Sequence, residues 1–173
     1  MPLTRPGKDQ YYLNMAGQVS QRGTCLRRRY GAVIVKDDQI MATGYAGAPR
    51  GVINCTDLGH CERQRQNIPA GQRYELCRSV HAEMNAVIHA SRQQTLGATL
   101  YLYGADVDSG QPIINPECCQ LCRRVIINAG IESVISQGPE GGINETLVRD
   151  WVARENQQLR GLLDAVNPGA QCC

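Results

Sequence analysis

The spacing of apolar residues predicts a helix followed by a strand hairpin in the first part of the chain. Residues 9–21 repeat apolar side chains at helical intervals, which predicts an amphipathic helix that packs on a core. The face of this helix is formed by Tyr12, Met15, Ala16 and Val19. Residues 31–35 and 39–43 are apolar runs joined by the turn Lys36-Asp37-Asp38, and this pattern predicts an antiparallel pair of strands.

The remaining elements alternate between helix and strand. HAEMNAVIHA, which begins at His81, has a helical period, and Ala98 to Tyr103 has the composition of a strand. CRRVIINA predicts a helix that ends at Gly130, and residues 131–136 predict another strand. Residues 144–166 predict a terminal helix capped by Asn144. Its apolar stripe is Leu147, Val148, Trp151, Val152, Leu159, Leu162, Leu163 and Val166.

This order of elements predicts an α/β fold with three layers, α/β/α, around a central mixed sheet. The length of 173 residues fits a single domain over residues 1–173. Residues 52–77 show no sustained period, and we expect a long irregular insertion there.

Composition and charge narrow the class of protein. The mean hydropathy of −0.34 is that of a globular chain, and no run approaches the ~18 apolar residues of a membrane span. The net charge of +2 argues against a protein whose main role is to bind nucleic acid stably, since phosphate contacts need a basic patch. The start MPLTRPGKDQ has no apolar core like that of a signal peptide, so we expect a cytoplasmic protein.

The cysteines favour metal binding over disulfide formation. The chain has 9 cysteines, an odd number, and a reducing cytosol disfavours structural disulfides. Cys172 and Cys173, at the end of the chain, receive no role from the sequence.

Two motifs together predict a catalytic zinc site. His81 and Glu83 form a His-x-Glu triplet, and Cys119 and Cys122 form a Cys-x-x-Cys pair downstream. Zinc prefers nitrogen and thiolate ligands in a tetrahedron, and a catalytic site keeps one position open for water. Either motif alone is ambiguous, because the first is common on helix surfaces and the second occurs in redox pairs and structural zinc sites. In this order, each at the start of a predicted helix, they predict three zinc ligands and a carboxylate, Glu83, that transfers protons.

The chain resembles the deoxycytidylate (dCMP) deaminases of the cytidine deaminase superfamily. The likeness runs from about Arg22 to Ile135, through GAVIVKD, ATGYAGAPRG, ELCRSVHAEMNAVI, ATLYLY and CRRVIINAGI. It implies hydrolysis of dCMP to dUMP and ammonia, which feeds dTMP synthesis, with His81, Cys119 and Cys122 as zinc ligands and Glu83 as the proton shuttle. It also implies a homo-oligomer, often a hexamer, and in many members allosteric control by dCTP and dTTP.

The resemblance also implies where the nucleotide binds. Arg92 falls where relatives place a basic residue on the 5′-phosphate, although a solvated arginine near a helix end explains it equally well. Arg27 and Arg28 are further phosphate candidates or surface charges. The family's nucleotide-contacting loop corresponds to residues 44–51, and from it we expect substrate contacts by Gly44, Tyr45, Ala46 and Gly47.

Three departures from the family pattern affect the site. Cys118 replaces the usual proline, which makes a Cys118/Cys122 register an alternative, but Cys119/Cys122 aligns the following helix without a gap. Ala46 replaces the usual asparagine, which removes a polar contact to sugar or base and bears on substrate preference. The loop before the cysteine pair is also longer than in many members.

Four further cysteines suggest a second, structural zinc. Cys25, Cys55, Cys61 and Cys77 lie in irregular chain upstream of the catalytic helix, and four thiolates are a closed structural zinc set. Some relatives carry such a zinc in this region, and His60 can replace one cysteine. The alternative is that these are buried free thiols.

Other functions compete with dCMP deamination. One class comprises other deaminases of the superfamily, acting on dCTP, a modified cytosine nucleotide, a free nucleoside, a riboflavin precursor or tRNA adenosine. A different class is a zinc-stabilised binding or competence-type protein without catalysis. Glu83 discriminates between the two classes, because a binding module has no need of it.

Overall fold

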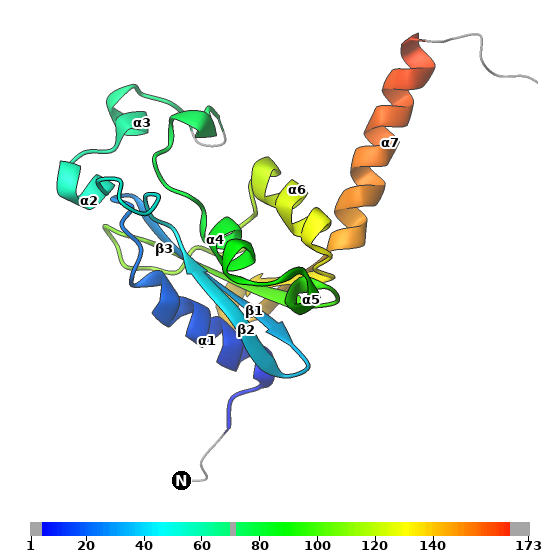
Figure 1. Cartoon of the computed structure of the whole chain (residues 1–173), viewed down its shortest axis with the longest axis horizontal. Helices are drawn as coiled ribbons and strands as arrows, with labels where there is room; N and C mark the ends of the chain where they lie inside the picture. The colour runs from blue at the N-terminus through cyan, green and yellow to red at the C-terminus, as the bar shows by residue number, and fades with distance from the viewer. Residues whose placement is uncertain (1–4, 70–71, 167–173) are drawn as a thin grey trace, which may run out of the picture.

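A five-stranded mixed sheet forms the centre of the molecule in the computed structural model, which describes residues 5–69 and 72–166, with the side chains of 163–166 left out (Figure 1). The strands are β1 (Arg28–Lys36), β2 (Gln39–Tyr45), β3 (Thr99–Asp106), β4 (Ser133–Gln137) and β5 (Ile143–Leu147), in the spatial order β2-β1-β3-β4-β5. The β3–β4 pair is parallel, and the other three pairs are antiparallel. The predicted mixed sheet is confirmed.

The hairpin of β1 and β2 has the predicted turn. Asp37 and Asp38 both have positive φ, at 49° and 62°, which is the geometry of a two-residue turn that matches strand twist. Two residues of α1 (Lys8–Ser20) bind Asp38. Lys8 Nζ donates a hydrogen bond to the Asp38 carboxylate at 2.7 Å, and the Tyr12 hydroxyl donates one to the same carboxylate at 2.8 Å.

Helices cover both faces of the sheet, as predicted. On one face, α1 packs Tyr12, Leu13 and Ala16 against Val33, Tyr101 and Ile135. The opposite face carries α4 (Ala82–His89), the short α5 (Arg92–Thr95) and α6 (Gln120–Ala129), whose buried residues share a core with Ile34, Leu100 and Leu102. The three layers are visible in Figure 1, and they form the predicted α/β/α arrangement.

Two glycines allow the helices to approach the sheet closely. A Cβ on Gly44 would lie 2.2 Å from the backbone nitrogen of Ala86 in α4, and one on Gly31 would lie 2.2 Å from the carbonyl oxygen of Ala16 in α1. No real Cβ tolerates such contacts, so each glycine fixes how near its helix lies to the strand.

The predicted insertion is a large loop that is closed at its base. Gly47 and Val80 exchange two backbone hydrogen bonds, at 3.2 and 2.8 Å, and so join the two ends of the segment between them. In its described residues the loop contains only short helical turns, α2 (Cys55–Leu58), α3 (Glu62–Arg65) and the 3₁₀ turn η1 (Tyr74–Leu76). It lies beside the N-terminal end of α4 (Figure 1).

The C-terminal region differs from the prediction at one point. The expected helix over 144–166 begins only at Val148 as α7 (Val148–Val166), because residues 143–147 form β5 after the 3₁₀ turn η2 (Pro139–Gly141). Pairing with β4 determines this strand, and such a non-local contact overrides the local helical pattern. Val148 and Trp151 are buried, whereas Val152, Leu159 and Leu162 are exposed on a helix that extends away from the body (Figure 1).

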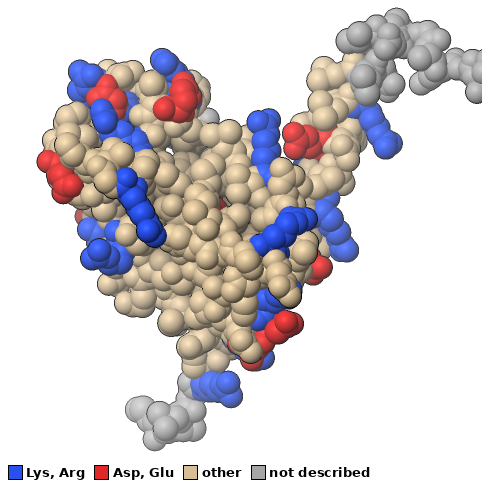
Figure 2. All heavy atoms as spheres, in the orientation of Figure 1, with Lys and Arg blue, Asp and Glu red and all other residues tan. Residues whose placement is uncertain are grey.

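The described part of the chain contains no helix that is both long and apolar enough to cross a membrane. Lysine and arginine side chains are scattered among acidic ones over the face seen in Figure 2, and that face shows no continuous basic stripe. This distribution agrees with the small net charge of +2.

Candidate active site

Two helices begin at the predicted metal ligands. His81 is the N-cap of α4, and Cys119 is the N-cap of α6, with Cys122 one turn into that helix. Because α4 and α6 pack side by side on the same face of the sheet, their N-terminal ends bring together residues that are distant in sequence. Free N–H groups at helix N-termini also favour negatively charged thiolates.

The three side chains form a compact set of potential metal ligands. Their donor atoms all lie within 4.8 Å of one another, and both sulfurs lie 3.4 Å from the Nδ1 atom of His81. Bond lengths of ~2.3 Å for zinc–sulfur and ~2.05 Å for zinc–nitrogen place such atoms about 3.6 Å apart across a tetrahedron. The observed separations therefore fit one zinc ion, with Cys119 rather than Cys118 as the first cysteine.

The protonation of this set also suits a cation. Hydrogen bonding to Cys119 and Cys77 raises the pKa of His81 to about 10. Hydrogen bonds from Cys122 and His81 lower the pKa of the Cys119 thiol to about 4. The pKa of Cys122 is raised by its hydrogen bond to Cys119 and by burial. A metal ion favours the deprotonated form of such thiols.

Glu83 is a buried carboxyl beside the ligands. Its side chain is 5% exposed, and burial raises its pKa despite the opposing effect of the His81 charge. The thiol of Cys118 is buried too, and its pKa is raised well above the usual value by burial and by the adjacent Glu83 carboxylate. Cys118 therefore packs against the carboxyl group, which explains why it is not turned toward His81.

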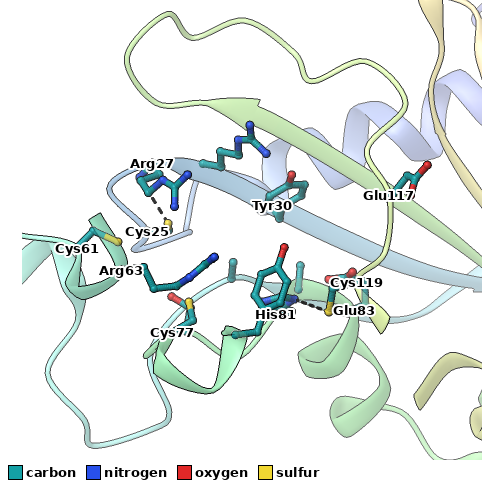
Figure 3. A pocket seen from close by; sticks show the side chains of 15 residues that line it. Cys25, Arg27, Tyr30, Cys61, Arg63, Cys77, His81, Glu83, Glu117 and Cys119 are labelled. Carbon is teal, nitrogen blue, oxygen red and sulfur yellow. Dashed lines mark hydrogen bonds between the residues drawn. The ribbon is translucent and has the colours of Figure 1, made fainter. Parts of the chain in front are cut away.

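A cavity of about 130 Å³ opens onto His81, Glu83 and Cys119. Tyr30, Arg27 and Arg28 line it from β1 and the segment before β1, while Arg63, Tyr74 and Cys77 line it from the insertion. In Figure 3 the labelled side chains of Arg27, Tyr30 and Arg63 point into the same space as His81. The wall of the cavity therefore carries potential metal ligands together with three arginines.

The predicted substrate loop is placed only partly as expected. Ala46 lines the cavity, but Gly44, Tyr45 and Gly47 do not. The side of Gly44 where a Cβ would stand faces the α4 backbone, and contact of this residue with the nucleotide stays a prediction. The Tyr45 carbonyl accepts a hydrogen bond from Asn85 at 2.8 Å, and Gly47 pairs with Val80.

Arg92 also lies away from this cavity. It begins α5, after the chain turns at the end of α4, and its guanidinium donates to the Asn128 carbonyl of α6. Within one chain, the structure therefore does not bring Arg92 to His81.

The second cysteine group is near the cavity but is not assembled as a metal site. Cys25, Cys61 and Cys77 line the cavity, and the pKa of buried Cys55 is raised by burial and by these three thiols. Among the described residues, His81, Cys119 and Cys122 form the one compact set of three or more potential ligand atoms. His60 Nδ1 lies 3.1 Å from the Leu58 carbonyl oxygen, and Cys77 hydrogen-bonds to His81 instead.

Tyr30, Arg63 and Tyr74 are among the cavity residues that were not expected from the sequence. Tyr30 directly precedes the predicted strand 31–35, and Arg63 and Tyr74 belong to a segment without a motif. Only the closure of the insertion brings Arg63 and Tyr74 to the site, so no local signal in the sequence identifies them.

Comparison with known proteins gives a consistent result. The family model described as the cytidine and deoxycytidylate deaminase zinc-binding region matches residues 6–137. A deoxycytidylate deaminase of Mycobacterium phage D29 is 36% identical over 138 residues, which cover 77% of this chain and 96% of that protein. One from Schizosaccharomyces pombe is 38% identical over 99 residues, 57% of this chain and only 30% of the longer yeast protein.

A solved structure shares the fold. The dCMP deaminase from the cyanophage S-TIM5, in complex with dCMP and dUMP, superimposes with a TM-score of 0.53 at 24% identity. The match covers 78% of this chain and 84% of that one.

Proposed function

Because the chain belongs to the cytidine and deoxycytidylate deaminase family, we propose that it hydrolyses dCMP to dUMP and ammonia. The observation that carries this proposal is the set of His81, Cys119 and Cys122 beside the buried Glu83, at a cavity whose wall also carries three arginines. A mononucleotide has the matching groups, a base to be deaminated and a phosphate to be bound.

The chain's residues have separate roles in this reaction. His81, Cys119 and Cys122 hold the zinc ion, which when bound acts as a Lewis acid that makes water nucleophilic at neutral pH. Glu83 accepts a proton from the attacking water and passes it to the ring nitrogen of cytosine. It then carries the second water proton to the leaving amino group, which departs as ammonia. The low exposure of Glu83 keeps bulk water from competing for these protons.

The first experiment measures ammonia release from dCMP, CMP, deoxycytidine and dCTP by the purified, zinc-loaded protein. Turnover of dCMP with little turnover of deoxycytidine is expected. Glu83→Gln should keep the bound zinc and the fold but lose activity by about 10²–10⁴-fold, the usual contribution of a general acid–base. Glu155→Gln, an exposed carboxylate on α7, is the matched control. Zinc-loaded wild type that releases no ammonia from dCMP would refute the proposal.

We propose that Cys25, Cys55, Cys61 and Cys77 hold a second, structural zinc ion. The support is the mutual proximity of their thiols, which rearrangement of side chains in the insertion can bring to one ion. Elemental analysis is then expected to give two zinc ions per chain, and one when Cys55 and Cys61 are both replaced by serine. A wild-type content of one ion, unchanged in this variant, would contradict the second site.

We also propose that the protein is a cytoplasmic homo-oligomer, a hexamer, that responds to dCTP and dTTP. The exposed apolar residues Val152, Leu159 and Leu162 of α7 support association, and the effectors rest on the family resemblance alone. Light scattering checks the oligomer, and dCMP titrations with and without each effector check the regulation.

A further inference from the structure

Arg63 is a buried arginine in a loop whose other charged residues are exposed or half-buried. Its residue exposure is 6%, whereas Arg65, two positions later in α3, has a side chain that is 65% exposed and pairs with Glu62. Arginine is rarely buried without a partner of opposite charge. No carboxylate within salt-bridge distance of Arg63 is found among the described residues.

Backbone carbonyls and an aromatic ring hold the Arg63 side chain in place. Its Nη2 atom donates to the carbonyl oxygens of Pro69 and Gln72, at 2.8 and 2.6 Å. Its guanidinium carbon lies 4.7 Å from the ring centroid of Tyr74, whose ring centroid lies 5.3 Å from that of His81. The guanidinium is therefore at most about 10 Å from the metal-ligand imidazole, a span that one nucleotide can bridge.

The hydrogen bonding of this guanidinium is incomplete. The Nε atom of Arg63 is buried and donates to no acceptor. Among the described residues, it is the one buried side-chain nitrogen or oxygen atom without a hydrogen-bond partner. A fixed cation with an unused donor, on the wall of a cavity, is suited to an anionic ligand rather than to a purely structural role.

We propose that Arg63 binds the 5′-phosphate of the substrate, so that the insertion supplies part of the nucleotide specificity of the site. This inference rests on the proposed deamination of dCMP. Arg27 and Arg28 line the cavity as well, and Figure 3 shows Arg27 and the insertion residue Arg63 on opposite sides of it. The phosphate is thus held between the two walls, and a turn of the Arg63 guanidinium toward the cavity gives its Nε donor an acceptor oxygen.

The test compares Arg63→Gln with wild type and with Arg65→Gln, which removes the same charge from the same short helix outside the cavity. Arg63→Gln is expected to raise the KM for dCMP by about 10–100-fold, which is the change in affinity that the loss of one charged hydrogen bond produces. The kcat should change by less than about threefold. Turnover of deoxycytidine, which has no phosphate, should be unchanged. Arg65→Gln should match wild type on both substrates.

If Arg63→Gln folds poorly, a second variant and a measurement on wild-type protein still test the proposal. Arg63→Lys keeps the charge and one donor to the loop carbonyls, and should raise the KM for dCMP by less than the Gln variant. In wild-type protein, the Nε–H resonance of Arg63 should shift on titration with dUMP and stay fixed with deoxyuridine.

The outcomes separate this inference from the proposed function. If wild type does not deaminate dCMP, the proposed function fails. The role of Arg63 is refuted if wild type is active but the KM of Arg63→Gln for dCMP stays within twofold of the wild-type value. It is also refuted if the Nε–H resonance of Arg63 does not shift on addition of dUMP. An equal loss of kcat on dCMP and deoxycytidine would also refute it, since that result indicates support of His81 through Tyr74.

Discussion

The contact between Gly44 and α4 controls the position of a metal ligand, and Gly44→Ala tests this directly. The added Cβ would lie 2.2 Å from the Ala86 nitrogen, 2.3 Å from the Ala82 carbonyl oxygen and 2.8 Å from the Asn85 carbonyl carbon. All three atoms belong to the backbone of α4, so no side-chain rotation relieves the contact. The helix itself has to move, and His81 at its N-cap moves with it.

The size of the shift follows from these distances. Real Cβ contacts are not shorter than 3.0 Å, so the nearest atom at 2.2 Å has to retreat by at least about 0.8 Å. Ligand distances in a metal site tolerate only about ±0.2 Å, and a misplacement of about 1 Å costs about 10²-fold in catalysis. The overpacking itself should cost about 1–3 kcal/mol of unfolding free energy.

Zinc affinity, measured by competition with a chromogenic chelator, and kcat for dCMP are the assays for Gly44→Ala. We expect zinc affinity to fall by at least about tenfold and kcat by about 10²-fold. Gly31→Ala is the matched control, because its Cβ would meet the Ala16 carbonyl oxygen at the same 2.2 Å but pushes on α1, across the sheet from the ligands. It should lose similar stability and keep its zinc affinity. Wild-type zinc affinity in Gly44→Ala, or an equal loss in both variants, would refute the reasoning.

Three further predictions concern stability. Asp38→Asn should destabilise the protein at pH 7, because hydrogen bonds from Lys8 and Tyr12 lower the pKa of Asp38 and so stabilise the fold while the carboxylate is ionised. The difference from wild type in thermal melts should shrink as the pH falls through the lowered pKa of Asp38, and a pH-independent difference would contradict this. Trp151→Ala should lower the free energy of unfolding in urea by about 3–5 kcal/mol, since Trp151 is buried beneath Arg123 at the base of α7. A decrease below about 1 kcal/mol would contradict this prediction. A zinc chelator should lower the melting temperature of wild type more than that of Cys119→Ser, because a zinc ion on His81, Cys119 and Cys122 would tie α4 to α6; equal shifts in both would exclude that link.

The sequence predicted that His81, Cys119 and Cys122 lie together, because the signal of each motif is local. His81 and Cys119 each stand directly before a helix, and helix N-termini have recognisable sequence patterns. The hairpin turn at Asp37 and Asp38 was predictable for the same reason, since the pattern that specifies it spans only a few residues.

Features that depend on distant contacts were missed. Residues 143–147 look helical until β4 pairs with them. The sequence shows that Gly44 is small but not that the α4 backbone occupies the space beside it. The burial of Arg63 depends on carbonyls of Pro69 and Gln72 that reach it only when the loop folds back, which no periodic pattern encodes.

The two backbone hydrogen bonds between Gly47 and Val80 have a consequence for how this enzyme can diversify. The loop between them leaves and re-enters the domain at adjacent points, so its length and sequence can change without altering the register of any strand. The proposed ligands His81, Cys119 and Cys122 lie outside the loop, whereas Arg63 and Tyr74 lie within it. Grafting a different loop between Gly47 and Val80 is therefore a practical route to new substrate preference on an unchanged reaction centre.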